Sequence, residues 1–181
     1  MSLTVTQNIT LDGVIDASEG WFAPAGQDQL DTSDIEAVLQ GHMAEEKALL
    51  LGRRTFEQMH GFWPQQADDT TGVKDHLNRM RKYVVSTTLQ DPEWDNSTVL
   101  RGIDEVRELE QRTELQLTGS MTLVRELIAQ GLVDEYRLFV YPVVLGRGFR
   151  LFEDATSVPD LELTGCRPFR SGVALMSYRR L

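Results

Sequence analysis

The sequence predicts an α/β domain whose sheet is largely parallel at first and antiparallel at its end. Short apolar runs, of the kind that form strands buried on both faces, alternate with stretches whose apolar residues recur every three or four positions. Towards the end of the chain, strand-like stretches dominate. The 181 residues contain no repeat and no linker-like tract, so we expect a single domain over residues 1–181.

Composition and period justify the expected strands. Residues 3–9 alternate apolar and polar side chains, and the Asp12-Gly13 pair that follows is typical of a hairpin turn. Four short apolar runs come next, and the final two strands are expected to pair antiparallel. In chain order we expect strands at 3–9, 47–52, 82–86, 97–100, 114–119, 134–146, 161–169 and 172–181.

The expected helices are justified by apolar stripes and by end signals. Ser33 and Thr55 are each followed three residues later by Glu or Gln, which is the pattern of a capping box. Asp104 is a suitable N-cap, and Gly131 can end the helix before it. In chain order we expect helices at 33–43, 55–60, 73–81, 104–111 and 121–130.

Composition excludes several classes of function. A formal net charge of −10 argues against a nucleic-acid or anionic-membrane surface. The single cysteine, Cys166, excludes an internal disulfide and a multi-cysteine metal site, and His60 and His76 lack metal-ligand spacing. No apolar run is long enough to span a bilayer, and the N-terminus does not read as a signal peptide. We therefore expect a cytoplasmic protein without a metal.

Polar residues follow three apolar strands, in the loops "GRRT" (52–55), "STT" (86–88) and "TGS" (118–120). Ligands of open α/β sheets sit beyond the carboxyl ends of strands, and phosphates sit on helix N-termini. Arg53 and Arg54 at the positive end of a helix are unfavourable unless an anion binds there. Three such loops together suit a long ligand with several phosphates.

Each loop also has a plain structural interpretation. Thr55 can simply cap its helix, and residues 86–88 can form an ordinary turn. Gly119 and Ser120 can be no more than the entry to a helix. Asp12 fits a hairpin turn as well as a catalytic role.

Taken together, these loops resemble the dihydrofolate reductase superfamily, and in particular the reductase domain of bacterial riboflavin-biosynthesis enzymes and its stand-alone relatives. The matching segments are "TLDGVI", "LLLGRRTFE", "KYVVSTTL", "GSMTLVRELIAQGLVDEYRLFVYPVVLGRGFRLF" and the final strand pair. The resemblance implies a mixed sheet of about eight strands flanked by helices. It also implies NADPH as cofactor and a homodimer.

The same resemblance implies roles for residues in the loops. The Gly-Arg-x-Thr segment would hold the pyrophosphate, Ser86 and Thr87 would face the 2′-phosphate, and Arg101 would lie near the adenine end. Asn8 and Ile15 would flank the nicotinamide. The expected cofactor-binding residues are Asn8, Ile15, Gly52, Arg53, Arg54, Thr55, Ser86, Thr87, Thr88, Arg101, Gly119, Ser120, Met121, Thr122 and Leu123.

The resulting hypothesis is an NADPH-dependent reductase of a small, flat heterocycle, such as a pterin, a pyrimidine or a flavin precursor. The protein would mainly orient the nicotinamide against an electrophilic carbon and exclude water. Asp12 and ordered water are the alternative proton donors. Candidates for the apolar walls of the substrate site are Trp21, Phe22, Trp63 and Phe149.

Two departures from the family pattern keep alternatives open. Thr6 stands where the riboflavin-pathway reductases carry a lysine, which argues against the riboflavin step itself. Glu36 falls near the acidic residue of the folate enzymes, but it also fits a capping box with Ser33. The alternatives are a true dihydrofolate reductase and a nucleotide-binding protein without catalysis.

Overall fold

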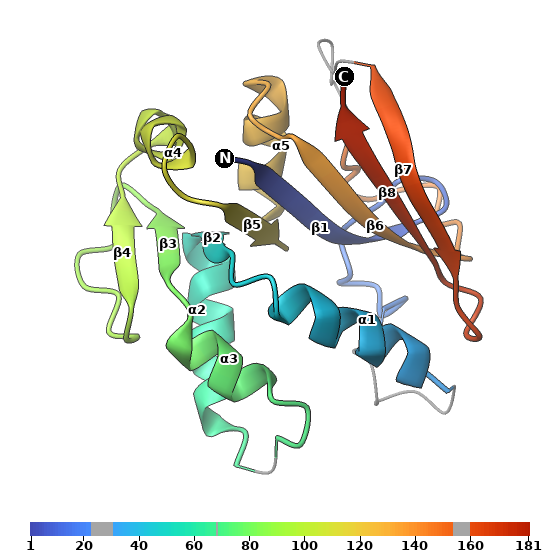
Figure 1. Cartoon of the computed structure of the whole chain (residues 1–181), viewed down its shortest axis with the longest axis horizontal. Helices are drawn as coiled ribbons and strands as arrows, with labels where there is room; N and C mark the ends of the chain where they lie inside the picture. Colours follow the sequence, from blue (N-terminus) through green and yellow to red (C-terminus); the bar gives the residue numbers. More distant parts are fainter. Residues whose placement is uncertain (23–30, 68, 154–159) are drawn as a thin grey trace.

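In the computed structural model, which describes residues 1–22, 31–67, 69–153 and 160–181, eight strands form one sheet (Figure 1). In chain order they are β1 (Leu3–Thr10), β2 (Ala48–Gly52), β3 (Lys82–Val85), β4 (Ser97–Leu100), β5 (Leu115–Thr118), β6 (Glu135–Tyr141), β7 (Leu161–Pro168) and β8 (Ala174–Arg180). Their order across the sheet is β4-β3-β2-β5-β1-β6-β8-β7.

The sheet is mixed, as the sequence predicts. The six neighbouring strands from β4 to β6 are parallel, whereas β8 runs antiparallel to both β6 and β7. The predicted α/β fold with an antiparallel C-terminal strand pair is confirmed. Because the six strands are parallel, their carboxyl ends meet at one edge of the sheet.

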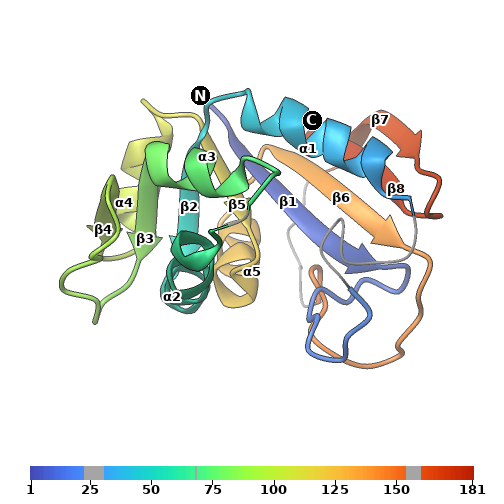
Figure 2. The same ribbon diagram turned by 90° about the horizontal axis from the view of Figure 1, so that it is seen from below.

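Helices cover both faces of this sheet (Figures 1 and 2). The helices α4 and α5 lie on one face, and α1, α2 and α3 lie on the other. Their bounds are α1 (Ser33–Met43), α2 (Arg53–Phe62), α3 (Val73–Arg79), α4 (Ile103–Glu110) and α5 (Met121–Ala129), with a 3-10 turn at Trp63–Gln65. None of the helices in the described ranges is long and apolar enough to cross a membrane.

Each face has its own apolar core. On one face Val124 and Leu127 of α5 are fully buried against strand residues that include Leu50 and Leu117. On the other face, Phe56 of α2 packs with the central strands, and α1 covers the end of the sheet near β8. Burial on both faces explains the near-continuous apolar run of β2.

Two of the predicted helix starts and one predicted cap are wrong. The helix α1 begins at Ser33, as predicted, but Ser33 bonds to Asp31 instead of forming a capping box. The helix α2 begins at Arg53, two residues before the predicted start. Gly102 is the N-cap of α4, so Asp104 lies inside the first turn, where a carboxylate still suits the helix dipole.

The predicted end of α5 is confirmed. Gly131 has a φ of +65°, and its N–H donates to the Ile128 carbonyl over 2.9 Å. A glycine in this left-handed conformation is the usual way for a helix to end. It turns the chain into β6.

The strand predicted over 134–146 is shorter in the structure. It ends at Tyr141, because the next residue is Pro142, which has no N–H for the ladder. The chain then folds beside the turn at Asp12 and Gly13, where the Leu11 N–H donates to the Val143 carbonyl over 2.9 Å. This predicted turn is confirmed, with a φ of +88° at Gly13.

Candidate functional site

The three polar loops singled out in the sequence lie along one edge of the sheet. Gly52 and Leu100 are both in register with Val85, which places the ends of β2, β3 and β4 side by side. The strand β5 pairs with β2 and β1, so the Gly119 loop lies next to the Gly52 loop. The structure therefore brings together loops that are far apart in sequence.

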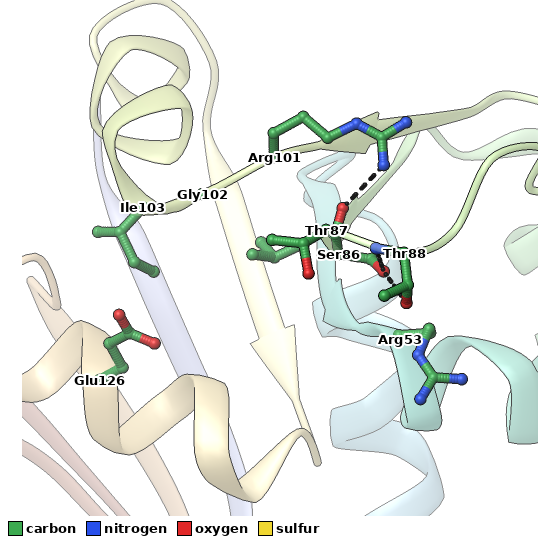
Figure 3. Close-up of a pocket in the computed structure, with 9 residues that line it drawn as sticks. Arg53, Ser86, Thr87, Thr88, Arg101, Gly102, Ile103 and Glu126 are labelled. Atoms are coloured by element: carbon green, nitrogen blue, oxygen red, sulfur yellow. Dashed lines mark hydrogen bonds between the residues drawn. The ribbon is translucent and has the colours of Figure 1, made fainter.

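A cavity of about 500 Å³ opens at the ends of β3 and β4 (Figure 3). Five expected cofactor-binding residues line it, together with four that the sequence did not indicate. The lining residues are Arg53, Val85, Ser86, Thr87, Thr88, Arg101, Gly102, Ile103 and Glu126.

The two adjacent arginines differ in their surroundings. Arg53 lines the cavity from the first position of α2, and its guanidinium bonds to the Glu57 carboxylate over 3.0 Å. Arg54 is exposed and is not among the residues that line the cavity. Of the two cations at this helix start, Arg53 is therefore the one placed to meet a ligand in the cavity.

Arg101 is fixed across the loop that follows β3. One nitrogen of its guanidinium donates to the Ser86 carbonyl over 3.1 Å (Figure 3). The same nitrogen donates to the Leu89 carbonyl over 2.7 Å. A guanidinium has five N–H donors, so donors remain for a ligand. The arrangement holds a positive charge in place at the cavity wall.

The loop at residues 86–88 is a turn as well as a cavity wall. The Ser86 hydroxyl accepts hydrogen bonds from the Thr88 N–H over 3.2 Å and the Leu89 N–H over 3.0 Å. The turn interpretation thus accounts for Ser86, which is 8% exposed. Thr87 and Thr88 are exposed. Their hydroxyls are the ones placed to meet a ligand.

Thr55 does not cap its own helix. Its hydroxyl accepts a hydrogen bond from the Ser120 N–H over 3.0 Å. The Ser120 hydroxyl in turn accepts the Gly52 N–H over 2.9 Å. Gly119 has a φ of +62°, and a Cβ there would lie 3.1 Å from the Thr55 methyl carbon. The close approach of the two loops therefore requires glycine at this position.

Gln7 belongs to this edge of the sheet, and the sequence prediction missed it. Its side chain is 4% exposed and donates to the Gly119 carbonyl over 2.6 Å. A signal was available, because Gln7 lies two residues from both Val5 and Ile9 and therefore shares their buried face of β1. A polar residue at such a position indicates a specific partner.

The remaining expected cofactor residues do not line the cavity. In the first turn of α5, Met121 is half-buried, Thr122 is exposed and Leu123 is part of the core. Ile15 is also a core residue, and its N–H donates to the Phe149 carbonyl over 2.9 Å. Asn8 is half-buried on β1. The nicotinamide contacts expected of Asn8 and Ile15 stay a prediction.

The four aromatic residues expected around the substrate do not form one group. Trp21 and Phe22 pack against Tyr141, with ring centroids 5.3 and 5.7 Å apart. Trp63 packs in the core between the sheet and the helices α2 and α3. Phe149 lies under the Arg125 guanidinium, 4.6 Å away, beside the core of the other face. Of these four residues, only Trp21 and Phe22 lie together.

Asp12 is held as a carboxylate by the turn that contains it. The Thr10 hydroxyl donates to it over 2.7 Å and the Gly146 N–H over 2.8 Å, and these bonds lower the pKa of Asp12 to about 2. A group with this pKa is ionised near neutral pH and is a poor proton donor. The hydrogen bonds give Asp12 a structural role, which the sequence left open.

Glu36, the candidate acid of a folate reductase, accepts a hydrogen bond from the Thr32 hydroxyl over 3.3 Å at the start of α1. Within the described residues, no three His, Cys, Asp or Glu side chains gather as a metal site would require.

Comparison with known proteins agrees with this architecture. The family model of the RibD C-terminal domain matches residues 1–175. The uncharacterized protein YyaP of Bacillus subtilis (strain 168) is 30% identical over 179 residues, which cover 94% of this chain and 90% of YyaP.

Solved structures share the fold at lower identity. A putative riboflavin biosynthesis protein from Shewanella sp. PV-4 has a TM-score of 0.71 at 19% identity and covers 100% of this chain and 99% of its own. A pyrimidine reductase-like protein from Corynebacterium diphtheriae has a TM-score of 0.63 at 14% identity, covering 99% and 92%. Dihydrofolate reductase from Enterococcus faecalis, complexed with NADP(H) and RAB-propyl, has a TM-score of 0.60 at 16% identity, covering 99% and 96%.

Proposed function

The chain belongs to the family of the RibD C-terminal domain, and we propose that it is an NADPH-dependent reductase of a small heterocyclic substrate. Its fold is of the reductase type, shared with dihydrofolate reductase. A pterin, a pyrimidine or a flavin precursor is the proposed class of substrate. We also propose that the protein acts in the cytoplasm as a homodimer.

One observation carries the proposal: two arginines and two threonine hydroxyls line a single cavity at the carboxyl edge of the sheet. The chain as a whole carries a net charge of −10, so this local group of cations stands out. Guanidinium groups and hydroxyls are the donors that recognise phosphate. The N-termini of α2 and α5 begin at the same edge and favour anions.

The residues present fit a dinucleotide with an additional phosphate. Arg101, with Thr87 and Thr88, would hold the 2′-phosphate, and Arg53 would hold the diphosphate. Gly119 lets Thr55 approach the backbone closely, which brings the loop before α5 against the start of α2. NADPH supplies the hydride when bound, and the protein orients it.

The proton comes from water in this proposal. The Asp12 carboxylate is tied to Thr10 and Gly146 and has a pKa of about 2, so it is ionised at the pH at which the enzyme would work. A substrate reduced here would therefore take its proton from solvent or carry it already. The same observation favours the second candidate function, a nucleotide-binding protein that does not catalyse.

A binding and turnover experiment tests both. NADPH binding is measured by calorimetry, and NADPH oxidation is followed by absorbance with a panel of oxidised pterins, pyrimidines and flavin precursors. Substrate-dependent oxidation supports the reductase. Tight NADPH binding without oxidation on the whole panel supports the non-catalytic protein, and a lack of NADPH binding contradicts both.

A further inference from the structure

A second cavity, of about 690 Å³, lies between α4 and the neighbouring strands β3 and β4 at one end of the sheet. Among the described residues, it shares no lining residue with the first cavity. It extends from Leu100, the last residue of β4, to Arg81, which precedes β3 (Figure 1). The cavity therefore runs beside α4 from the carboxyl edge of the sheet towards the opposite edge, and the proposed reductase makes no use of it.

The floor of this second cavity is apolar and aromatic. Leu100 of β4 and Leu109 of α4 are core residues, and Tyr83 of β3 is half-buried against the same core. All three line the cavity. A hydrocarbon chain laid over this floor would therefore be removed from water, which is favourable.

Charged side chains of both signs surround this floor. Glu105 and Glu108 lie three residues apart on α4, so they share one face of the helix. Arg112 follows the end of α4, and Arg81 precedes β3. All four residues line the cavity. The carboxylates thus lie towards one end of the cavity and the guanidinium groups towards the other.

These charges do not neutralise one another. Within the described part of the chain, the side chains of Arg81, Arg112 and Glu108 form no hydrogen bond or ion pair. One oxygen of Glu105 accepts the Arg101 N–H over 3.1 Å, and its other oxygen accepts no bond from these residues. All four charged side chains that line the cavity are exposed, so a ligand can reach them without a rearrangement of the core.

We propose that this cavity is a second small-molecule site, which binds a linear ω-amino carboxylate. The ammonium group of such a ligand meets the two glutamates, its carboxylate meets the two arginines, and its hydrocarbon chain covers the apolar floor. Glu105 lies about 8 Å along the helix axis from Glu110, the last residue of α4, so several carbon atoms must separate the two charges. A ligand with a single charge leaves one pair of side chains without a partner, and a dianion is repelled by the glutamates.

Three probes of equal chain length test this site on the wild-type protein. They are 6-aminohexanoate, which carries both charges, and hexanoate and hexylamine, which carry one each. Calorimetry at constant ionic strength measures their affinities, and the shifts of amide NMR signals locate them. We expect 6-aminohexanoate to bind about tenfold more tightly than either other probe and to shift signals within 81–83, 98–100 and 105–113. Glycine, whose charges lie too close together, should bind as weakly as the single-charge probes.

Arg112→Gln and Glu108→Gln each remove one charge from the rim of the cavity. Each should weaken 6-aminohexanoate binding about fivefold. Arg112→Gln should leave hexylamine binding unchanged, and Glu108→Gln should leave hexanoate binding unchanged. Arg107→Gln is the matched control, because Arg107 lies on α4 outside the cavity and its guanidinium bonds to the Gln130 side chain over 3.5 Å.

Three results would overturn the proposed site: no binding of 6-aminohexanoate at millimolar concentration, equal affinities for the three probes of equal length, or equal effects of Arg112→Gln and Arg107→Gln. None of these measurements involves NADPH. The site therefore stands or falls independently of the proposed reductase function.

Discussion

The guanidinium of Arg53 lies 3.0 Å from the carboxylate of Glu57, one turn further along α2. The same arginine lines the cavity at the ends of β3 and β4, so its charge faces two possible partners. The side chains of the pair are 44% and 47% exposed. An exposed pair of this kind contributes about 0–1 kcal/mol, whereas a charge-assisted bond to a phosphate contributes about 1.5–3 kcal/mol. We therefore expect a phosphate to displace Glu57.

Arg53→Ala should weaken NADPH binding by about one to two decades, because it removes this charge-assisted bond. The melting temperature of the ligand-free protein should hardly change, since the variant loses a weak surface pair and also removes a cation from the positive end of a helix. Calorimetry and thermal unfolding measure the two effects.

Arg54→Ala is the matched control for Arg53→Ala, because Arg54 begins the same helix but does not line the cavity. It should bind NADPH like the wild type. If Arg53→Ala also binds NADPH normally, or if the ligand-free protein unfolds without Arg53, the segment is structural and the phosphate assignment is wrong.

Arg101 should determine the preference for NADPH over NADH. At equal concentration we expect NADPH to raise the melting temperature of the wild type more than NADH does, by mass action on the folded state. Arg101→Leu should abolish this difference, because it removes the cation that we expect to face the 2′-phosphate and leaves a shorter apolar side chain in its place. Equal shifts by both cofactors in the wild type would count against a 2′-phosphate site at Arg101.

The sequence predicted the fold and the meeting of the polar loops at one edge of the sheet, for one physical reason. Short apolar runs such as that of β2 mark strands buried on both faces, and parallel strands must end at the same edge. Residues that follow such strands, for example Arg53 and Thr87, therefore had to come together around a common cavity.

The sequence did not predict which partner each polar side chain takes. Thr55 and Ser120 are 65 residues apart, and their bond exists only because two loops meet in the folded sheet. The local sequence pattern predicted that Thr55 caps its own helix. In the folded protein its hydroxyl instead accepts the N–H of Ser120 from a distant loop. The alternation of β1 did indicate a buried position for Gln7, but its partner Gly119 again comes from a distant loop.

Asp12→Asn should leave turnover intact and lower the melting temperature above about pH 4, and this difference from the wild type should disappear as the pH falls towards 2. The Asp12 carboxyl has its pKa lowered to about 2 in the folded state from its usual 3.8, chiefly by the Thr10 hydroxyl. Its ionised form therefore stabilises the fold above about pH 4, and this contribution is lost as the pH falls towards 2. Thermal unfolding of the wild type and of Asp12→Asn across this range measures the difference. Loss of substrate-dependent NADPH oxidation in a folded Asp12→Asn protein would instead restore Asp12 as the proton donor.

The outer strand β7 leads us to expect a homodimer. None of its eight residues is buried, and Leu163, opposite Tyr178 of β8, is 52% exposed. A β-bulge between Leu163 and Gly165 interrupts the register of this edge, and bulges hinder edge-to-edge pairing. We therefore expect two copies to pack through the face of β7 and β8 that carries Leu163.

Light scattering at micromolar concentration should give a mass of about 41 kDa, which is twice the chain mass of 20.5 kDa. Leu163→Asp places a charge in this expected interface and should shift the mass to that of one chain, because an unpaired charge buried in an interface is costly. Val144→Asp is the control, since Val144 is a 67% exposed apolar residue outside β7 and β8. The control should remain a dimer. A wild type that is monomeric at this concentration would contradict the expected assembly, and a dimer that survives Leu163→Asp would place the interface elsewhere.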